Sequence, residues 1–119
     1  MKENDLVDRL LDFTVNVILF LRKFPNHEEY KIIKYQLIKS ASSSGANYEE
    51  SQGASSKMDF TNKVRISLKE MRESNYWLKV IKGIIEKEEL IKECNTLIQE
   101  SKELKNIFGA ICKNTTRKK

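Results

Sequence analysis

Proline and glycine are scarce in this sequence, with one proline and four glycines among 119 residues. Charged residues make up 33% of the chain, and this combination favours a helical protein over a sheet-rich or disordered one. Long apolar runs are also missing, because the longest covers only residues 17–21 and a bilayer span needs roughly 18 residues. The N-terminus, MKENDLVDRL, is too acidic and too interrupted for a signal peptide. We therefore expect a cytoplasmic protein that does not bind a membrane.

Histidine and cysteine are too few to form the usual catalytic or metal-binding sets. The one histidine, His27, falls in a predicted turn, so no Ser/His/Asp or Cys/His arrangement is expected. Cys94 and Cys112 fall on one predicted helix about 27 Å apart, which excludes a disulfide between them. Carboxylate-bridged metal bundles use two Glu-x-x-His motifs, which a single histidine cannot supply. We predict no enzyme activity, no cofactor and no small-molecule substrate; the alternative is a metal or acid–base site made of Glu50, Glu70 and Glu73.

The net charge of +5 is concentrated at the C-terminus. Residues 113–119, KNTTRKK, contain four basic residues and no acid, and the rest of the chain then holds 18 basic against 17 acidic residues. The sequence therefore predicts two parts. Residues 1–112 form a nearly neutral helical domain, and residues 113–119 form a disordered basic tail.

Apolar side chains recur at helical spacing through four segments that turn signals separate. Pro25 ends the first segment, Gly53 follows the second, and Ser55 or Ser56 precedes the third. Residues 40–56 are small and polar, but so long a loop is uncommon in a small domain, so we expect the second helix to continue to about Ser51. Short connections between long helices predict an all-α fold, an antiparallel up-down-up-down four-helix bundle. The predicted helices cover about residues 5–24, 27–51, 56–85 and 89–112.

The first predicted helix has a wider apolar arc than one bundle seam requires. A second apolar line lies beside its inward line, so this helix is either deeply buried or faces another subunit. The second line consists of Val7, Leu11, Thr14, Ile18 and Leu21. The inward lines of the four helices are Leu6, Leu10, Phe13, Val17, Phe20 and Phe24; then Tyr30, Ile33 and Leu37; then Phe60, Val64, Ser67, Met71, Ser74, Leu78, Ile81 and Ile85; and last Leu90, Cys94, Leu97, Ser101, Leu104, Phe108 and Ile111.

The small, polar half of the second helix should lie against a charged part of the third. A hairpin that turns near Ala54 places Ser40 level with Lys69 and Glu70, and Gln36 level with Glu73. Such residues can form a semi-buried structural network, which fixes helix register and adds little net stability. The predicted network consists of Gln36, Ser40, Ser44, Asn47, Glu50, Lys69, Glu70 and Glu73.

Basic side chains and one tyrosine follow a line along the third helix. Arg65, Lys69, Arg72, Tyr76 and Lys79 are spaced by four, three, four and three residues. A basic line with an aromatic ring can follow a phosphate backbone and stack on a base. The alternative interpretation is a solvated helix face. The predicted nucleic-acid contacts are Arg65, Arg72, Tyr76, Lys79, Lys113, Arg117, Lys118 and Lys119.

Two segments carry a resemblance to a known family: KSASSSGANYEES at residues 39–51 and DFTNKVRISLKEMRESNYWLK at residues 59–79. They resemble the four-helix-bundle family of 23S rRNA intervening-sequence proteins. The resemblance implies a small bacterial homopentamer without an established catalytic residue. A related branch, the accessory proteins of diversity-generating retroelements, is more basic and binds a reverse transcriptase and nucleic acid. The matching elements are Ser40–Ala41, Ser44, Ala46–Asn47, Glu50, Asp59–Phe60, Lys69–Glu70, Glu73 and Trp77–Leu78.

These observations leave two functional hypotheses of different kinds. The first is a non-enzymatic oligomer that binds RNA through basic lines or tails repeated in each subunit. The second is a protein-interaction scaffold that binds no nucleic acid. The two differ in the salt dependence that they predict for RNA binding.

Overall fold

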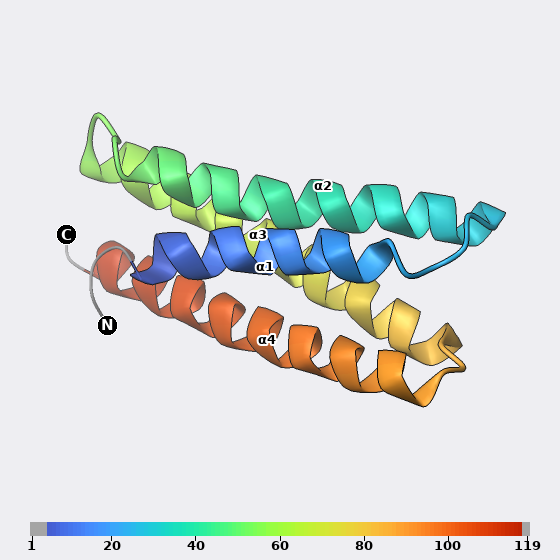
Figure 1. The fold of residues 1–119 in the computed structure, drawn as a ribbon. Coiled ribbons are helices and arrows are strands. Elements are labelled where there is room, and N and C mark those ends of the chain that lie inside the picture. The colour runs from blue at the N-terminus through green and yellow to red at the C-terminus, as the bar shows by residue number, and fades with distance from the viewer. Residues whose placement is uncertain (1–4, 118–119) are drawn as a thin grey trace.

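The chain forms four helices, which Figure 1 shows running back and forth along one long axis. The computed structural model describes residues 5–117, and side chains as far as residue 115. No strand occurs in residues 5–117, which confirms the predicted all-α class. The helices are α1 (Asp5–Leu21), α2 (Glu28–Ser51), α3 (Lys57–Ile84) and α4 (Glu88–Arg117).

The helices form a ring of antiparallel neighbours about 49 × 24 × 21 Å in extent. Within the described chain, α1 packs on α2, α2 on α3, α3 on α4 and α4 on α1, while the diagonal pairs make no close backbone approach. This arrangement is the expected up-down-up-down bundle. As a result, α1 begins and α4 ends at the same end of the bundle (Figure 1).

The predicted inward lines form the hydrophobic core. The largest side chains that are fully buried include Phe13, Phe20, Met71, Leu104 and Phe108. Further apolar residues along the helices, such as Ile38, Leu68 and Ile98, pack against this core while remaining partly exposed. None of the helices in the described part of the chain is long and apolar enough to cross a membrane.

Helix α1 ends earlier than the sequence suggested. It stops at Leu21 and not at Phe24, and residues 22–24 form a turn. The residue before a proline avoids helical geometry, so Pro25 forces Phe24 out of the helix and the last turn unwinds with it. Phe24 is nevertheless buried as predicted, because the turn folds its ring back onto Phe20 and Tyr30, with centroid distances of 4.9 and 5.2 Å.

Helix α2 runs through its small, polar half to Ser51, as predicted. The backbone N–H of Gly53 donates to the carbonyl of Glu50, which closes the last turn. Gly53 does not take the positive φ of a left-handed cap, so its freedom from a side chain is not what ends the helix. Helix α3 then starts at the expected serine, since Ser56 Oγ accepts from the Asp59 N–H at 3.0 Å.

Helix α4 continues past the boundary predicted at Cys112. Its backbone stays helical to Arg117, so residues 113–117 are not the disordered tail that their composition suggested. No glycine or proline follows Cys112 to stop the helix, and basic residues near a helix C-terminus interact favourably with its dipole. Lys118 and Lys119 lie outside the described residues.

Candidate nucleic-acid interface and assembly face

A line of buried serines joins α2 to α3. Ser44 Oγ donates to the Ser67 carbonyl, and Ser67 Oγ donates to the Ser44 carbonyl, each at 2.8 Å. One turn away, the hydroxyls of Ser40 and Ser74 are 2.8 Å apart. All four side chains are fully buried, so each polar group is satisfied without taking a charge out of water. We call Ser40, Ser44, Ser67 and Ser74 the serine seam.

The serine seam contains only two members of the predicted polar network, Ser40 and Ser44. Ser40 faces Ser74, four to five residues beyond the predicted partners Lys69 and Glu70, whereas the Ser44–Ser67 pair departs from the same predicted register by only one to two residues. The connection itself runs from the C-cap Gln52 to the N-cap Ser56, and it is centred on Ala54 as predicted. Ser67 and Ser74 stood on the predicted inward line of α3, so their apolar-type spacing was the signal that could have identified them.

The other predicted network residues lie at the edge of the seam and are not connected to one another. Gln36 and Glu70 are half-buried, and Lys69 is exposed. Asn47 donates within its own helix, to the Ser43 carbonyl at 2.9 Å. Glu50 forms an ion pair with Lys63 at 3.5 Å, and Glu73 accepts from the indole N–H of Trp77 at 3.1 Å.

Buried polar groups also connect α3 to α4, and the predicted network had not included them. Asn75 Nδ2 donates to Ser101 Oγ at 2.8 Å, and Cys94 Sγ donates to the Leu78 carbonyl at 3.3 Å. Burial raises the pKa of the Cys94 thiol to about 11, against a weaker opposite effect from Lys82. Cys94 is therefore an inert core residue, as its position on the inward line suggested.

The predicted basic line of α3 lies on the surface. Arg65, Lys69, Arg72, Tyr76 and Lys79 are all exposed. Within the described side chains, none of the four cations forms an ion pair, whereas Arg9, Lys23 and Lys63 all do. We call Arg65, Lys69, Arg72 and Lys79 the cationic line.

The cationic line borders α4. Burial raises the pKa of the half-buried Cys112 thiol, and Arg65 and Arg72 oppose this rise through space, so both guanidinium groups lie near this residue of α4. The basic residues beyond Cys112 continue from the same end of α4. Lys113 is exposed, whereas the side chains of Arg117, Lys118 and Lys119 lie outside the described part of the chain, so their predicted contacts stay predictions.

The second apolar line of α1 is partly buried and partly exposed. Leu21 is in the core, and Val7, Thr14 and Ile18 are half-buried. The outermost side chains are aliphatic and spaced by four residues: Leu11, Val15 and Leu19 are 62%, 45% and 47% exposed. We call Leu11, Val15 and Leu19 the α1 stripe.

An open groove of about 260 Å³ lies between α1 and α2 beside this stripe. Leu11 and Val7 line it from α1, and Gly45 and Ala46 line it from α2. A side-chain β-carbon on Gly45 would lie 3.6 Å from Leu10 Cβ, so the small residues bring the two helices into contact. The stripe and the groove together form a largely apolar surface of the kind that marks interaction sites.

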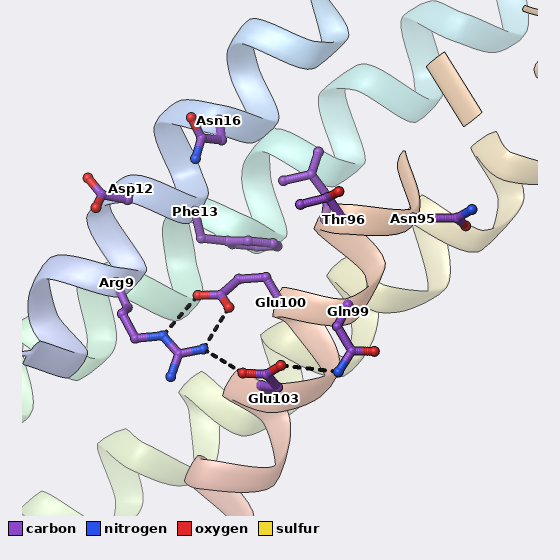
Figure 2. Close-up of a pocket in the computed structure, with 10 residues that line it drawn as sticks. Arg9, Asp12, Phe13, Asn16, Asn95, Thr96, Gln99, Glu100 and Glu103 are labelled. Carbon is purple, nitrogen blue, oxygen red and sulfur yellow. Dashed lines mark hydrogen bonds and ion pairs between the residues drawn. The ribbon is translucent and has the colours of Figure 1, made fainter. Parts of the chain in front are cut away.

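A larger cleft, of about 600 Å³, opens between α1 and α4 (Figure 2). Arg9 crosses it to the Glu100 carboxylate, with N–O distances of 2.6 and 3.0 Å, and also reaches Glu103 at 3.1 Å. Figure 2 shows Gln99 holding the far side of Glu103, a hydrogen bond of 3.1 Å. The polar groups at the centre of the cleft thus bind one another, and their ion pairs join α1 to α4.

The ion pairs in this cleft predict that the stability lost on replacing Arg9 depends on pH. Hydrogen bonds from Gln99 and Arg9 lower the pKa of Glu103 from 4.5, so its stabilising contribution is present above pH 4.5 and lost as the pH falls through the lower folded-state value. The hydrogen bond to Glu100 raises the Arg9 pKa, which keeps Arg9 charged throughout this range. In urea unfolding, Arg9→Gln should cost up to about 1 kcal/mol at pH 7. The deficit should shrink by pH 3; an equal deficit at both values would contradict the ion-pair explanation.

The described side chains include no cluster of three or more His, Cys, Asp or Glu residues that could hold a metal ion. Glu50 belongs to an ion pair and Glu73 to a hydrogen bond with tryptophan, so the alternative metal or acid–base site is not assembled from Glu50, Glu70 and Glu73 in this arrangement. The chain can therefore offer a ligand two kinds of surface, a cationic one on α3 and an apolar one on α1.

Comparisons with known proteins agree with this architecture. The chain is similar in structure to a protein of unknown function from the S23 ribosomal protein family of Bacteroides thetaiotaomicron. The two are 29% identical, the match covers 91% of this chain and 98% of the other, and the TM-score is 0.78. No curated protein matches the sequence. A family model described as 23S rRNA-intervening sequence protein matches residues 2–110. The chain therefore belongs to the family of 23S rRNA-intervening sequence proteins.

Proposed function

We propose that this protein is a non-enzymatic homopentamer that binds RNA along α3 of each subunit. The observation that carries the proposal is the cationic line, four exposed cations with no anionic partner in the described part of the chain. Unpaired cations in a row attract a polyanion, and RNA phosphates supply anions at regular spacing.

The cationic line has the length and the straightness that a backbone contact needs. From Arg65 to Lys79 it follows one side of a single helix, which extends roughly 21 Å at 1.5 Å per residue. Residues 1–112 as a whole are nearly neutral, with 18 basic and 17 acidic residues, and the cationic line supplies four of those basic residues. The attraction is therefore local to α3 and to the C-terminal end of α4, and does not come from a strongly charged protein as a whole.

The α1 stripe supports the assembly part of the proposal. Three exposed aliphatic side chains on one helix form a surface that a second copy can cover. Five subunits would present five cationic lines to one RNA, and linked weak contacts give an avidity far above the affinity of each. A family resemblance to homopentamers supports the number five.

The test is to titrate a fluorescent structured RNA into the protein at several salt concentrations, with the oligomer mass measured on the same sample. For single-stranded segments, four phosphate contacts predict a slope of log affinity against log salt of about −3 for each engaged subunit. Replacing the cationic line with glutamine should weaken binding about a hundredfold at low salt and flatten this slope. The replaced residues are Arg65, Lys69, Arg72 and Lys79.

A charge-matched control separates this surface from net charge. The control variant carries Lys31→Gln, Lys39→Gln, Lys87→Gln and Lys92→Gln, four exposed lysines elsewhere, and should keep most of the affinity. Equal losses in the two variants would show non-specific attraction and contradict an RNA site on α3. Neutralising the C-terminal residues Lys113, Arg117, Lys118 and Lys119 should weaken binding to a smaller extent.

The second candidate function is a protein-interaction scaffold without nucleic-acid binding, which the α1 stripe also favours. It predicts an intact oligomer that binds no RNA even at low salt. The same titration therefore decides between the two functions, because the oligomer mass is measured together with the affinity.

A further inference from the structure

We propose that Tyr76 is a stacking site for an unpaired nucleobase, so that the cationic line binds single-stranded rather than duplex nucleic acid. This inference rests on the proposed function and adds the class of ligand to it.

Tyr76 stands within the cationic line. It follows Arg72 by four residues and precedes Lys79 by three, so the ring lies on the same side of α3 as the flanking cations. The side chain is 58% exposed. Its hydroxyl makes no hydrogen bond to another described residue, so no polar contact within the described chain requires a tyrosine at this position. A strand whose phosphates meet Arg72 and Lys79 would place its bases next to this ring.

Neighbouring side chains hold the ring in place. Trp77 packs against Tyr76 in a T-shaped pair, with centroids 5.1 Å apart and an interplanar angle of 73°. The indole N–H of Trp77 donates to Glu73 Oε2 at 3.1 Å, and Trp77 is itself half-buried. Glu73 therefore holds the Trp77 ring through a hydrogen bond, and Trp77 in turn holds the Tyr76 ring by packing against it. A ring held before binding loses less entropy when a base stacks on it.

The geometry leaves an aromatic face available. In a T-shaped pair the edge of one ring meets the face of the other, so at least one face of Tyr76 is not covered by Trp77. A base in a duplex is already stacked on both sides, whereas an unpaired base can place its face on an aromatic side chain. The combination of a free ring face and flanking cations therefore selects for single strands.

Charge is distributed unevenly around the ring. Glu70 and Trp77 follow Ser67 and Ser74 by three residues each, so they lie near the side of α3 that faces α2. Arg65 and Arg72 lie near Cys112 on α4. Two of the four cations thus lie on the α4 side of Tyr76, and a carboxylate lies on the α2 side. Tyr76 lies between the two sides.

The chain offers a matched control, because Tyr35 on α2 is also an exposed tyrosine, at 61%. Its ring is approached by the Lys39 ammonium at 5.9 Å from the centroid, and it stands apart from the cationic line. Truncating Tyr35 removes the same atoms as truncating Tyr76, from a position on α2 that is flanked by the exposed Lys31 and Lys39 but has no tryptophan beside it. Tyr76→Phe is the second control, because it keeps the ring and removes only the hydroxyl.

The experiment titrates short oligonucleotides that contain 2-aminopurine, as single strands and as duplexes of the same sequence, into the full-length protein. RNA and DNA versions are both used, since the face of a base is common to them. Stacking on Tyr76 should quench the single-strand fluorescence. Tyr76→Ala should abolish this quenching and weaken single-strand binding about thirtyfold, the middle of the range measured for one stacked base. Tyr76→Phe and Tyr35→Ala should behave like the unmodified protein, and the duplex should bind more weakly and show no effect of Tyr76→Ala.

Other outcomes overturn the inference, and they are distinguishable from failure of the proposed function. Salt-dependent binding that is the same in Tyr76→Ala and the unmodified protein would leave the cationic line standing and exclude base stacking. Equal losses for single strands and duplexes would also exclude it. Absence of binding by the unmodified protein at low salt, with RNA and with DNA, would remove the RNA function and the stacking site together. Circular dichroism and unfolding curves of each variant show that the bundle itself is intact.

Discussion

Ser67→Leu should lower the free energy of unfolding by about 3 kcal/mol. Ser67 is fully buried, and its hydroxyl lies 2.8 Å from the Ser44 carbonyl of the facing helix. A leucine at this position would force the two helices apart or into poor rotamers, which costs about 1–3 kcal/mol. Loss of the reciprocal hydrogen bond adds roughly 1 kcal/mol. Urea unfolding followed by far-ultraviolet circular dichroism measures the sum.

Two further variants separate the cost of the added side-chain volume from the cost of the lost hydrogen bond. Ser67→Ala removes the hydroxyl without adding volume, so it should cost only about 1 kcal/mol. Ser42→Leu adds the same volume at an exposed position of α2 beside the open groove to α1, where the hydroxyl bonds only within its own helix, and should change stability little. If Ser67→Leu were as stable as Ser67→Ala, the α2–α3 contact would have room for a large side chain and the serine seam would not determine helix spacing.

The serine seam also shows which part of the interior could be predicted from the sequence. Local periodicity placed Ser67 and Ser74 on the inward line of α3, because spacing along a helix is a local property, and the predicted polar network placed Ser40 and Ser44 against α3. Which of them meet depends on the relative shift of two helices, and the capped connection at residues 52–56 sets that shift. The predicted network included Glu70 and Glu73, but carboxylates are costly to bury without cations. Hydroxyl and carbonyl groups of the two helices therefore occupy the serine seam, and the two acids stay at its edge.

The arrangement of the surface residues, like that of the interior, could be predicted only in part. The order of residues in the cationic line could be predicted, because steps of three and four keep side chains on one side of a helix whatever surrounds it. That these cations lack ion pairs could not be predicted, since their neighbours on α4 are distant in sequence. The support of Tyr76 by Trp77 and Glu73 was likewise hidden. Glu73 and Trp77 are four residues apart, which permits a contact but does not require one.

The helix ends show the limits of local signals more directly. Pro25 gave the position of the first turn, but the early end of α1 at Leu21 also depends on where the core accepts the Phe24 ring. At the other end of the chain, composition suggested a tail after Cys112, whereas the backbone continues as helix to Arg117. A basic composition describes the charge of a segment and does not by itself determine its conformation.

The second large effect is expected at the α1 stripe, where Leu11→Gln, Val15→Gln and Leu19→Gln together should dissociate the proposed oligomer into monomers. The three side chains are already 45–62% exposed in the single chain, so the substitutions should not unfold the bundle. An aliphatic side chain at the centre of an interface contributes at least about 1 kcal/mol, so three of them weaken each subunit contact roughly a hundredfold. Sedimentation or light scattering over a range of concentrations measures the change.

The matched control replaces three exposed apolar residues of α3: Met58→Gln, Ile66→Gln and Ile84→Gln, which lie outside the stripe. This variant should keep the oligomer mass of the unmodified protein. The reverse pattern, dissociation in the control and a stable assembly in the α1 variant, would place the subunit contact on α3 and contradict the assignment of α1. A monomeric unmodified protein would exclude the assembly proposal itself.

The α1 variant also tests why five copies should be needed. Glutamine adds no charge, so the cationic line and Tyr76 are unchanged in each monomer, and any change in RNA binding comes from the loss of linked copies. Affinity should then fall to that of a single line, and the salt slope should approach the value of about −3 for one set of four cations. If the monomer bound RNA as tightly as the oligomer, avidity would not explain the assembly. The α1 surface would then serve a protein partner, while α3 alone would account for the RNA.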